Sequence, residues 1–381
     1  MLLACKDTQS FLFTAEIKLN ARLGYLIPID FFKNSLTLHR VLPLHRQVEF
    51  GIQVNIVLLF YMKKNFFKSV CLILAAVTLF SGCENGIDDS EKQDAVVAIL
   101  KTSSNDFWQQ VGYSINATCE EKGITPFITF TRDEEDAQSQ LDAVKSIATI
   151  KEKYNVKAII VTPIFSENDF EVDKAVAECA GSEIPVIIID TPVDAGKSPL
   201  KDVFKAYVGT DNVGAGEFLG AKLADLSKSD LLTARFENAR SPLLRYEGFC
   251  KGIGFEADVW KANETETPSS MSAELEQHPS VTDVVFFTGK LCESVMSALD
   301  GKNVYTFDAH KEFFNSIEAG GCIKGIVAQN TFEMGRKAVQ AAYDQNVSKE
   351  IYIPVIYVTA DNIASAEVKP FIDYFHSGKA E

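Results

Sequence analysis

Short apolar runs rich in Val and Ile alternate with longer amphipathic stretches from Asp94 onward. A continuous apolar run bounded by polar residues is typical of a strand that is buried on both faces of a sheet. The runs that predict strands are AVVAIL (95–100), PFITF (126–130), KAIIVT (157–162), PVIIID (185–190), KAYVG (205–209), LLTARF (231–236), DVVFFTG (283–289), NVYTFD (303–308), GIVAQ (325–329) and IYIPVIYV (351–358), the last broken by Pro354.

The stretches between these runs have the apolar spacing of helices. In residues 133–153, for example, Leu141, Val144 and Ile147 fall on one helical face. Helices are predicted over 107–122, 133–153, 169–180, 212–226, 243–253 and 331–343. Alternating strands and helices favour parallel sheets covered on both faces, and the series is too long for one open sheet. The sequence therefore predicts an α/β fold with two doubly wound parallel-sheet lobes.

Charge is distributed unevenly along the 381 residues, whose formal net charge is −15. Residues 1–83 hold nine of the 37 basic and four of the 52 acidic side chains. The remainder thus has 28 basic and 48 acidic side chains, a net charge of −20. A body this acidic repels phosphate backbones, which argues against binding of nucleic acid.

The residues before Cys83 have the three parts of a secretory signal. Lys63, Lys64 and Lys68 form a basic segment, and Val70–Phe80 is an apolar segment too short to span a bilayer well. The sequence LFSGC (79–83) then resembles a bacterial lipoprotein lipobox, although Phe80 stands where Leu is usual. The resemblance implies that residues 62–82 are a signal peptide and that Cys83 is lipidated. A buried helix that ends in Gly-Cys is the alternative.

The segments on either side of this signal are interpreted accordingly. Residues 83–93 are polar and acidic, as in a flexible tether, and two acyl chains on Cys83 would give stable membrane anchorage. Because a signal peptide works only at an N-terminus, residues 1–61 are interpreted as an upstream mis-start, with translation beginning at Met62. The alternative is an expressed segment in which Ile52–Phe60 and Val70–Phe80 form an apolar hairpin anchor.

Five cysteines follow Cys83, and none of them belongs to a C-x-x-C pair. They are Cys119, Cys179, Cys250, Cys292 and Cys322. We interpret them as small, buried apolar residues, with one disulfide as the alternative.

Polar and aromatic side chains gather directly after the predicted strands. In parallel sheets, ligands bind at the carboxyl ends of the strands. Carboxylates and amides form hydrogen bonds with vicinal hydroxyls, and the arginine guanidinium donates several N–H hydrogen bonds. Aromatic faces pack on sugar rings. The same residues have an alternative interpretation, because aspartates at strand ends often cap the following helix and aromatic residues often belong to the core. The candidate ligand-binding residues are Asn105, Phe107, Trp108, Asp190, Arg245, Asp308 and Gln329.

Several segments carry a family resemblance in a consistent order. They are SSNDFWQQVGYSINATCEEKG (103–123), IPVIIIDTP (184–192), YVGTDNVGAGEFLG (207–220), RYEGF (245–249), VYTFDA (304–309) and GIVAQNTFEMGRKAV (325–339). Over residues 94–360 the chain resembles type I periplasmic sugar-binding proteins of the ribose-binding group, which share their body with LacI-type repressors. In that group the seven candidate residues fall on ligand-contact positions. Thr191 stands where Arg is common, and Gly289-Lys290 replaces the usual Asn-Asp.

The resemblance also implies how the chain is divided. An N-terminal lobe would comprise residues 94–209 and 331–354, and a C-terminal lobe residues 210–330 and 355–381. Three crossovers would join the lobes near Gly209–Asp211, Gln329–Asn330 and Pro354. A ligand bound between them would close the lobes by hinge bending.

Other chemistries find little support in the sequence. GAGEFLG (214–220) is one residue too long for a dinucleotide fingerprint, so its glycines are interpreted as sites of close helix packing. His278, His310 and His376 have no metal-ligand spacing, so neither a metal nor a cofactor is expected. No nucleophile or carboxylate pair of an enzyme is recognisable in the sequence. A LacI-type repressor would need a helix-turn-helix before the body and a basic face, and neither is recognisable.

The function expected is therefore that of a monomeric, lipid-anchored solute-binding protein in the bacterial cell envelope. It would capture a pentose or hexose in the interlobe cleft and deliver it to the permease of an ABC-type transporter. The alternative is a sensor that presents a sugar or another small polar solute to a membrane receptor kinase.

Overall fold

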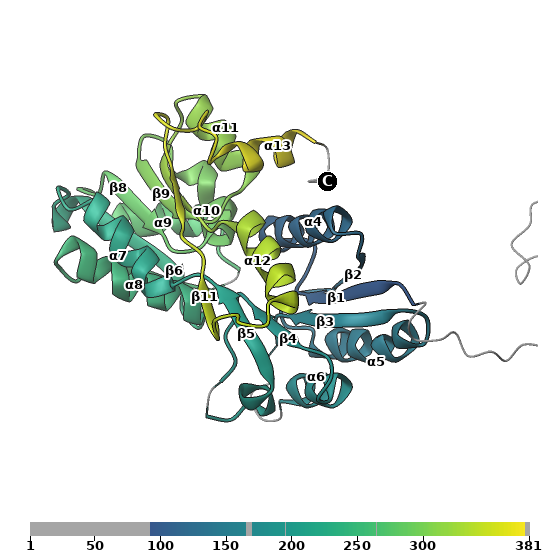
Figure 1. Ribbon diagram of the computed structural model, residues 1–381. Coiled ribbons are helices and arrows are strands. Elements are labelled where there is room, and N and C mark those ends of the chain that lie inside the picture. The colour runs from purple at the N-terminus through teal and green to yellow at the C-terminus, as the bar shows by residue number, and fades with distance from the viewer. Residues whose placement is uncertain (1–91, 165–169, 195, 264, 378–381) are drawn as a thin grey trace, which may run out of the picture. The chain divides into compact units, whose positions relative to one another are not determined.

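The computed structural model describes residues 92–164, 170–194, 196–263 and 265–377 (Figure 1). The predictions for the upstream segment, the signal peptide, lipidated Cys83 and the tether as far as residue 91 lie outside these residues. Within the described part of the chain, no helix is both long and apolar enough to cross a membrane.

The first sheet belongs to the N-terminal lobe and has six parallel strands in the order β11-β5-β4-β3-β1-β2. Alternate residues of each strand face opposite layers of helices. In β1, Val96 and Ala98 pack under α4 and α12, whereas Val97 and Ile99 pack against α5 and α6 (Figure 1). The bounds are β1 Asp94–Leu100, β2 Thr125–Phe130, β3 Asn155–Val161, β4 Val186–Ile189, β5 Phe204–Gly209, β11 Glu350–Tyr352, α4 Asp106–Glu121, α5 Ala137–Lys153, α6 Glu171–Ala180 and α12 Thr331–Tyr343.

The second sheet belongs to the C-terminal lobe and has the order β12-β10-β9-β8-β6-β7, in which only β12 is antiparallel. Helices α7 and α8 cover one face, and α9, α10, α11 and α13 cover the other (Figure 1). The bounds are β6 Leu231–Phe236, β7 Val259–Ala262, β8 Asp283–Phe286, β9 Asn303–Phe307, β10 Ile323–Ala328, β12 Ile356–Val358, α7 Asn212–Lys222, α8 Arg240–Ile253, α9 Pro268–Gln277, α10 Gly289–Val295, α11 Lys311–Glu318 and α13 Lys369–His376.

The chain passes between the two sheets three times. It leaves the first sheet after β5 and the second after β10, and it crosses again between β11 and β12. The prediction of two doubly wound lobes joined by three crossovers is therefore confirmed.

Helices α9, α10, α11 and α13 were not predicted, and two of the strand predictions also differ from the structure. The run 351–358 is not a single strand, because β11 pairs with β5 while β12 pairs with β10 in the other sheet. Pro354 lies between them, where no ladder hydrogen bond is required of it. Strand β7 was not predicted, because it is a short edge strand whose residues are only partly buried and form no continuous apolar run.

Helices α7 and α8 approach each other closely at glycines, as predicted for GAGEFLG. A Cβ atom on Gly216 would lie 2.0 Å from the carbonyl oxygen of Arg245, and one on Gly248 would lie 2.0 Å from that of Val213. No side chain fits at either position. This contact fixes the turn of α8 that carries Arg245.

Candidate ligand-binding site

Two aspartates occupy equivalent positions in the two sheets. Asp190 directly follows β4 and Asp308 directly follows β9, each the third strand in its sheet order. Both have left-handed backbone conformations, with φ of 62° and 67°. Their amides donate equivalent hydrogen bonds, from Asp190 to Val208 at 2.9 Å and from Asp308 to Val327 at 3.1 Å. Such backbone strain in a non-glycine residue gathers at functional sites, because the surrounding structure must hold it.

In the C-terminal lobe, Asp308 and Arg245 form an almost fully enclosed ion pair. Nη1 of Arg245 lies 3.4 Å from Oδ1 of Asp308, and the two side chains are 4% and 14% exposed. The guanidinium also donates to Asn212 Oδ1 at 2.8 Å and to the Phe287 carbonyl at 3.0 Å, and it lies over the ring of Phe307. These contacts hold the arginine in one orientation.

Gln329 completes this cluster from the second crossover. Its Nε2 donates to Oδ1 of Asp308 at 2.8 Å, and its Oε1 accepts from the hydroxyl of Thr210 at 2.8 Å. The other carboxylate oxygen of Asp308 accepts from the backbone N–H of Gly289 at 3.1 Å. The structure therefore brings together three of the residues predicted from the sequence: Arg245, Asp308 and Gln329.

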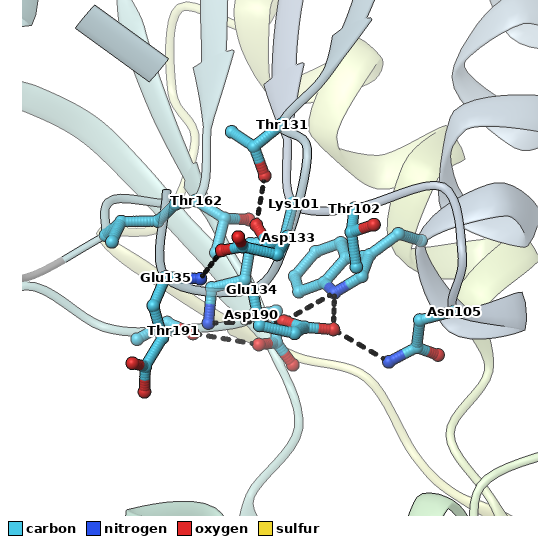
Figure 2. Close-up of polar contacts among 12 residues, drawn as sticks. Lys101, Thr102, Asn105, Thr131, Asp133, Glu134, Glu135, Thr162, Asp190 and Thr191 are labelled. Carbon is cyan, nitrogen blue, oxygen red and sulfur yellow. Dashed lines mark hydrogen bonds and ion pairs between the residues drawn. The ribbon is translucent and has the colours of Figure 1, made fainter. Parts of the chain in front are cut away.

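In the N-terminal lobe, a second cluster surrounds the carboxylate of Glu134 (Figure 2). Asn105 Nδ2 donates to Glu134 Oε1 at 2.9 Å, and Trp108 Nε1 donates to the same oxygen at 3.1 Å. The ammonium of Lys101 lies 3.8 Å from Oε2 of Glu134. Asn105 also caps α4, because its Oδ1 accepts from the backbone N–H of Phe107.

The aromatic pair at the start of α4 is buried. Phe107 and Trp108 are 8% and 3% exposed, and their rings meet edge to face with centroids 4.7 Å apart. Both pack in the core formed by β1, α4 and α12. The sequence left open whether these aromatics contact a ligand or belong to the core. The structure places both in the core, beside the strand ends.

Asp190 links the two clusters electrostatically. Burial raises the pKa of its carboxyl group, and the negative charge of Asp308 raises it further. Lys101, a 2.9 Å hydrogen bond from the Thr191 hydroxyl and Arg245 each act in the opposite direction. Thr191, which stands where the family pattern has arginine, thus donates to this carboxylate from the adjacent position.

A hollow of about 720 Å³ lies at the strand ends, and side chains of both lobes line it. Lys290 comes from the C-terminal lobe, and the acidic loop between β2 and α5 supplies most of the opposite wall. Its lining residues are Thr102, Ser104, Arg132, Asp133, Glu134, Glu135, Asp136 and Lys290.

Sequence reasoning missed Lys101 and Glu134. Lys101 directly follows β1, so the strand-end rule that selected Asp190 would also have found it. Glu134 was not selected as a candidate residue because the sequence predicts a helix that begins at Asp133. The helix instead begins at Ala137, because the side chain of Asp136 accepts from the backbone N–H of Ser139 as an N-cap.

The family model for the periplasmic binding protein domain matches residues 96–350. That match covers more than half of the chain, so the chain belongs to the periplasmic binding protein family. No sequence relative was found among curated proteins.

Solved structures of the same type are similar over nearly their whole length. GanP, a glucose-galactose binding protein from Geobacillus stearothermophilus, is 23% identical, with a TM-score of 0.56 over 72% of this chain and 99% of GanP. A carbohydrate transporter solute binding protein from Agrobacterium radiobacter in complex with D-arabinose is 20% identical, with a TM-score of 0.59 over 74% of this chain and 99% of that one. An ABC transporter periplasmic solute binding protein from Actinobacillus succinogenes with bound D-allose is 20% identical, with a TM-score of 0.59 over 71% and 98% of the chains. The likeness establishes a type I periplasmic binding protein fold.

Proposed function

We propose that this protein binds a small sugar in the interlobe cleft and delivers it to the permease of an ABC-type transporter. The observation that carries the proposal is the pair of strand-end aspartates, one in each lobe, together with the fixed guanidinium of Arg245. Two carboxylates accept hydrogen bonds from vicinal hydroxyls, while the guanidinium donates to ring or hydroxyl oxygens.

The arrangement also predicts ligand-driven closure. A ligand that contacts Asp190 and Asp308 simultaneously stabilises only the conformation in which both lobes face it. Solved relatives of this fold are named as binders of glucose and galactose, D-arabinose and D-allose, which supports a monosaccharide as the ligand.

The remaining elements of the proposal concern location. Family membership is consistent with a place outside the cytoplasm. The lipobox-like sequence LFSGC supports lipid anchorage at Cys83, with the polar residues that follow it acting as a tether. Metabolic labelling with a palmitate analogue would detect the lipid, and labelling that survives in Cys83→Ser would contradict the anchor.

A thermal-shift panel tests sugar binding directly. A ligand that binds the folded state raises the melting temperature by mass action, by an amount equivalent to about 2.7 kcal/mol at a hundred times its Kd. The panel should contain pentoses, hexoses, sugar alcohols, nucleosides and amino acids. Stabilisation by one sugar is the expected result. Stabilisation only by an amino acid or a nucleoside, in protein refolded to remove carried-over ligand, would contradict the proposal.

A further inference from the structure

A second hollow, of about 530 Å³, lies between helix α4, the edge strand β2 and helix α13, and we call it the α4–α13 groove (Figure 1). Its apolar walls are formed by Tyr113 of α4, Ile128 and Phe130 of β2, and Tyr374 of α13. The rings of Tyr113 and Tyr374 meet edge to face with centroids 5.5 Å apart. The volume and the aromatic walls of this groove are those of a small-molecule site.

A glycine on α4 brings the edge strand close to the helix. Gly112 lines the groove, and a Cβ atom on it would lie 2.8 Å from Cζ of Phe130. A larger residue at this position would compete with the Phe130 ring for the same space. The absence of a side chain at Gly112 thus lets an aromatic wall form beside the helix.

The polar side chains of the groove are engaged with protein partners. Gln109 Oε1 accepts from the Tyr374 hydroxyl at 3.2 Å, and Gln109 Nε2 donates to the Ser103 carbonyl at 2.6 Å. Asn116 Nδ2 donates to Glu120 Oε1 at 2.6 Å. A compound with many hydroxyls would leave several of them without partners here, which costs free energy. An aromatic ring needs no such partners and gains edge and face contacts with the rings of the walls.

The groove is uncharged, although the protein around it is strongly acidic. None of the eight described residues that line it carries a charge. The chain after Cys83 has a net charge of −20, which repels an anion. A cation that enters the groove would lose hydration without meeting a carboxylate in the wall. These conditions favour an uncharged compound.

Both lobes contribute to the groove. Tyr374 comes from the C-terminal lobe, whereas the other lining residues come from the N-terminal lobe. The hydrogen bond between Tyr374 and Gln109 therefore joins the lobes. The next residue of α4 makes a second bond of this kind, because Gln110 Nε2 donates to the carbonyl of Ala309 at 3.1 Å. A compound that contacts both walls should stabilise this arrangement of the lobes.

We infer that the α4–α13 groove is a second binding site, separate from the strand-end site, for an uncharged aromatic compound of one or two rings, and that its occupancy is coupled to sugar binding. A sugar between Asp190 and Asp308 and a compound between Tyr113 and Tyr374 each bridge the two lobes, so each should favour the conformation that the other binds. The coupling rests on the proposed sugar-binding function, whereas the site itself does not.

Saturation-transfer NMR and calorimetric titration of the purified full-length protein, without sugar, test the site. The probes are indole and p-cresol. Indole-3-acetate and tryptamine are the charged analogues of indole, and 4-hydroxyphenylacetate and tyramine are those of p-cresol. At least one uncharged probe should bind, with its charged analogues about tenfold weaker or more. Binding of neither uncharged probe would overturn the site, and equally tight binding of a charged analogue would overturn the ligand class.

Two neighbouring positions on β2 provide a matched pair of variants. Ile128 lines the groove, whereas Thr129 is exposed and points to the opposite face of the strand. Ile128→Glu places a carboxylate in the wall, so the Kd of the bound probe should rise by about tenfold or more. Thr129→Glu adds the same charge to the same strand and should leave the Kd unchanged. Equal Kd values for the two variants would show that the probe binds elsewhere.

A second variant keeps the test decisive if Ile128→Glu does not fold. Asn116 lines the groove from a half-buried position, so Asn116→Tyr should fill part of the groove without adding a charge. Probe binding should be lost while thermal unfolding remains cooperative. Wild-type affinity for the probe in folded Asn116→Tyr would overturn the site.

Titration of sugar in the presence of the bound probe tests the coupling. The sugar is the one among D-arabinose, D-glucose, D-galactose and D-allose that binds most tightly. A saturating probe should lower its Kd by about fivefold or more, and the sugar should lower the Kd of the probe by the same factor. Tyr374→Phe keeps the ring but removes the hydroxyl bond to Gln109, so this factor should shrink while the probe still binds.

The outcomes separate this inference from the proposed function. If none of these sugars binds to the wild-type protein, the proposed function and the coupling fail, and the probes and groove variants still decide the site. If a sugar binds with a Kd that the saturating probe does not change, the coupling alone is overturned.

Discussion

The hydroxyl of Thr210 donates a 2.8 Å hydrogen bond to Oε1 of Gln329, and this bond joins the first crossover to the second. Nε2 of the same glutamine donates to Asp308 at 2.8 Å. One buried side chain therefore connects two interlobe segments to a strand-end carboxylate of the candidate site. Gln329 thus belongs both to the crossovers that form the hinge and to the candidate site. A substitution that alters the hinge should therefore also alter ligand binding.

Separate substitutions should distinguish the two bonds of Gln329. Thr210→Val removes the hinge bond alone, and the sugar Kd should rise about fivefold, equivalent to about 1 kcal/mol for one hydrogen bond. Gln329→Leu removes both bonds and leaves Asp308 without its amide partner, so the loss should be larger. Calorimetric titration measures both, and equal Kd values for the two variants would show that the bond to Asp308 contributes nothing.

Sugar affinity should depend on pH through Asp190. Burial raises the pKa of this carboxyl group, so as the pH falls it becomes protonated earlier than an ordinary aspartate. The protonated form loses acceptor capacity, and affinity should fall by up to tenfold per pH unit once the pH is below this raised pKa. Asp190→Asn should bind weakly and show no such dependence. A wild-type affinity that stays constant down to pH 4 would contradict an essential Asp190 carboxylate.

The stability of the fold should depend on His310. Burial alone lowers the pKa of this imidazole, but its bond to Glu293 and the charges of Asp308 and Asp106 outweigh burial and raise it above the usual value. A raised pKa contributes stability that is complete below the unfolded value of about 6.5 and is lost as the pH rises through the folded value.

His310→Gln removes this contribution. Urea unfolding should show wild type more stable than the variant at pH 5.5, with a smaller difference at pH 9, because a constant packing term remains. His278→Gln, a partly exposed histidine of the same lobe, is the control. A difference in unfolding free energy that grows with pH would contradict the raised pKa.

Close packing of α7 on α8 should matter for both folding and binding. Gly216→Ala places a Cβ atom 2.0 Å from the carbonyl oxygen of Arg245, so the helices must separate. Overpacking of this kind costs about 1–3 kcal/mol, and the displacement moves the guanidinium. Thermal unfolding and sugar titration should both be impaired, whereas Ala221→Ser on the exposed side of α7 should affect neither. Unchanged stability of Gly216→Ala would contradict the helix contact.

The sequence predicts the layout of this fold well because its core strands are buried on both faces. The run LLTARF (231–236), for example, forms β6 with the predicted bounds, and its first five residues are buried. Strand β7 and the division of 351–358 between two sheets could not be predicted, because edge strands are short and pairing depends on distant segments.

The candidate site was predictable only where strand ends define it. Asp190, Asp308 and Gln329 follow apolar runs directly, and the proximity of Asp308 to Gln329 follows from their place after the neighbouring parallel strands β9 and β10. Glu134 lies four residues beyond β2, in a loop whose sequence Arg132–Asp136 resembles the polar start of a helix. Its role depends on contacts with Asn105 and Trp108, which are distant in sequence, so no local pattern could reveal it.

Calorimetric titration of the sugar that stabilises the wild-type protein most, against Asp190→Ala and Arg245→Ala, tests the central claim most directly. The two residues lie in different lobes, so loss of binding in both variants, at least about a hundredfold and with thermal unfolding still cooperative, is the predicted result. Unchanged affinity in both variants would contradict a ligand held between the strand ends of the two lobes.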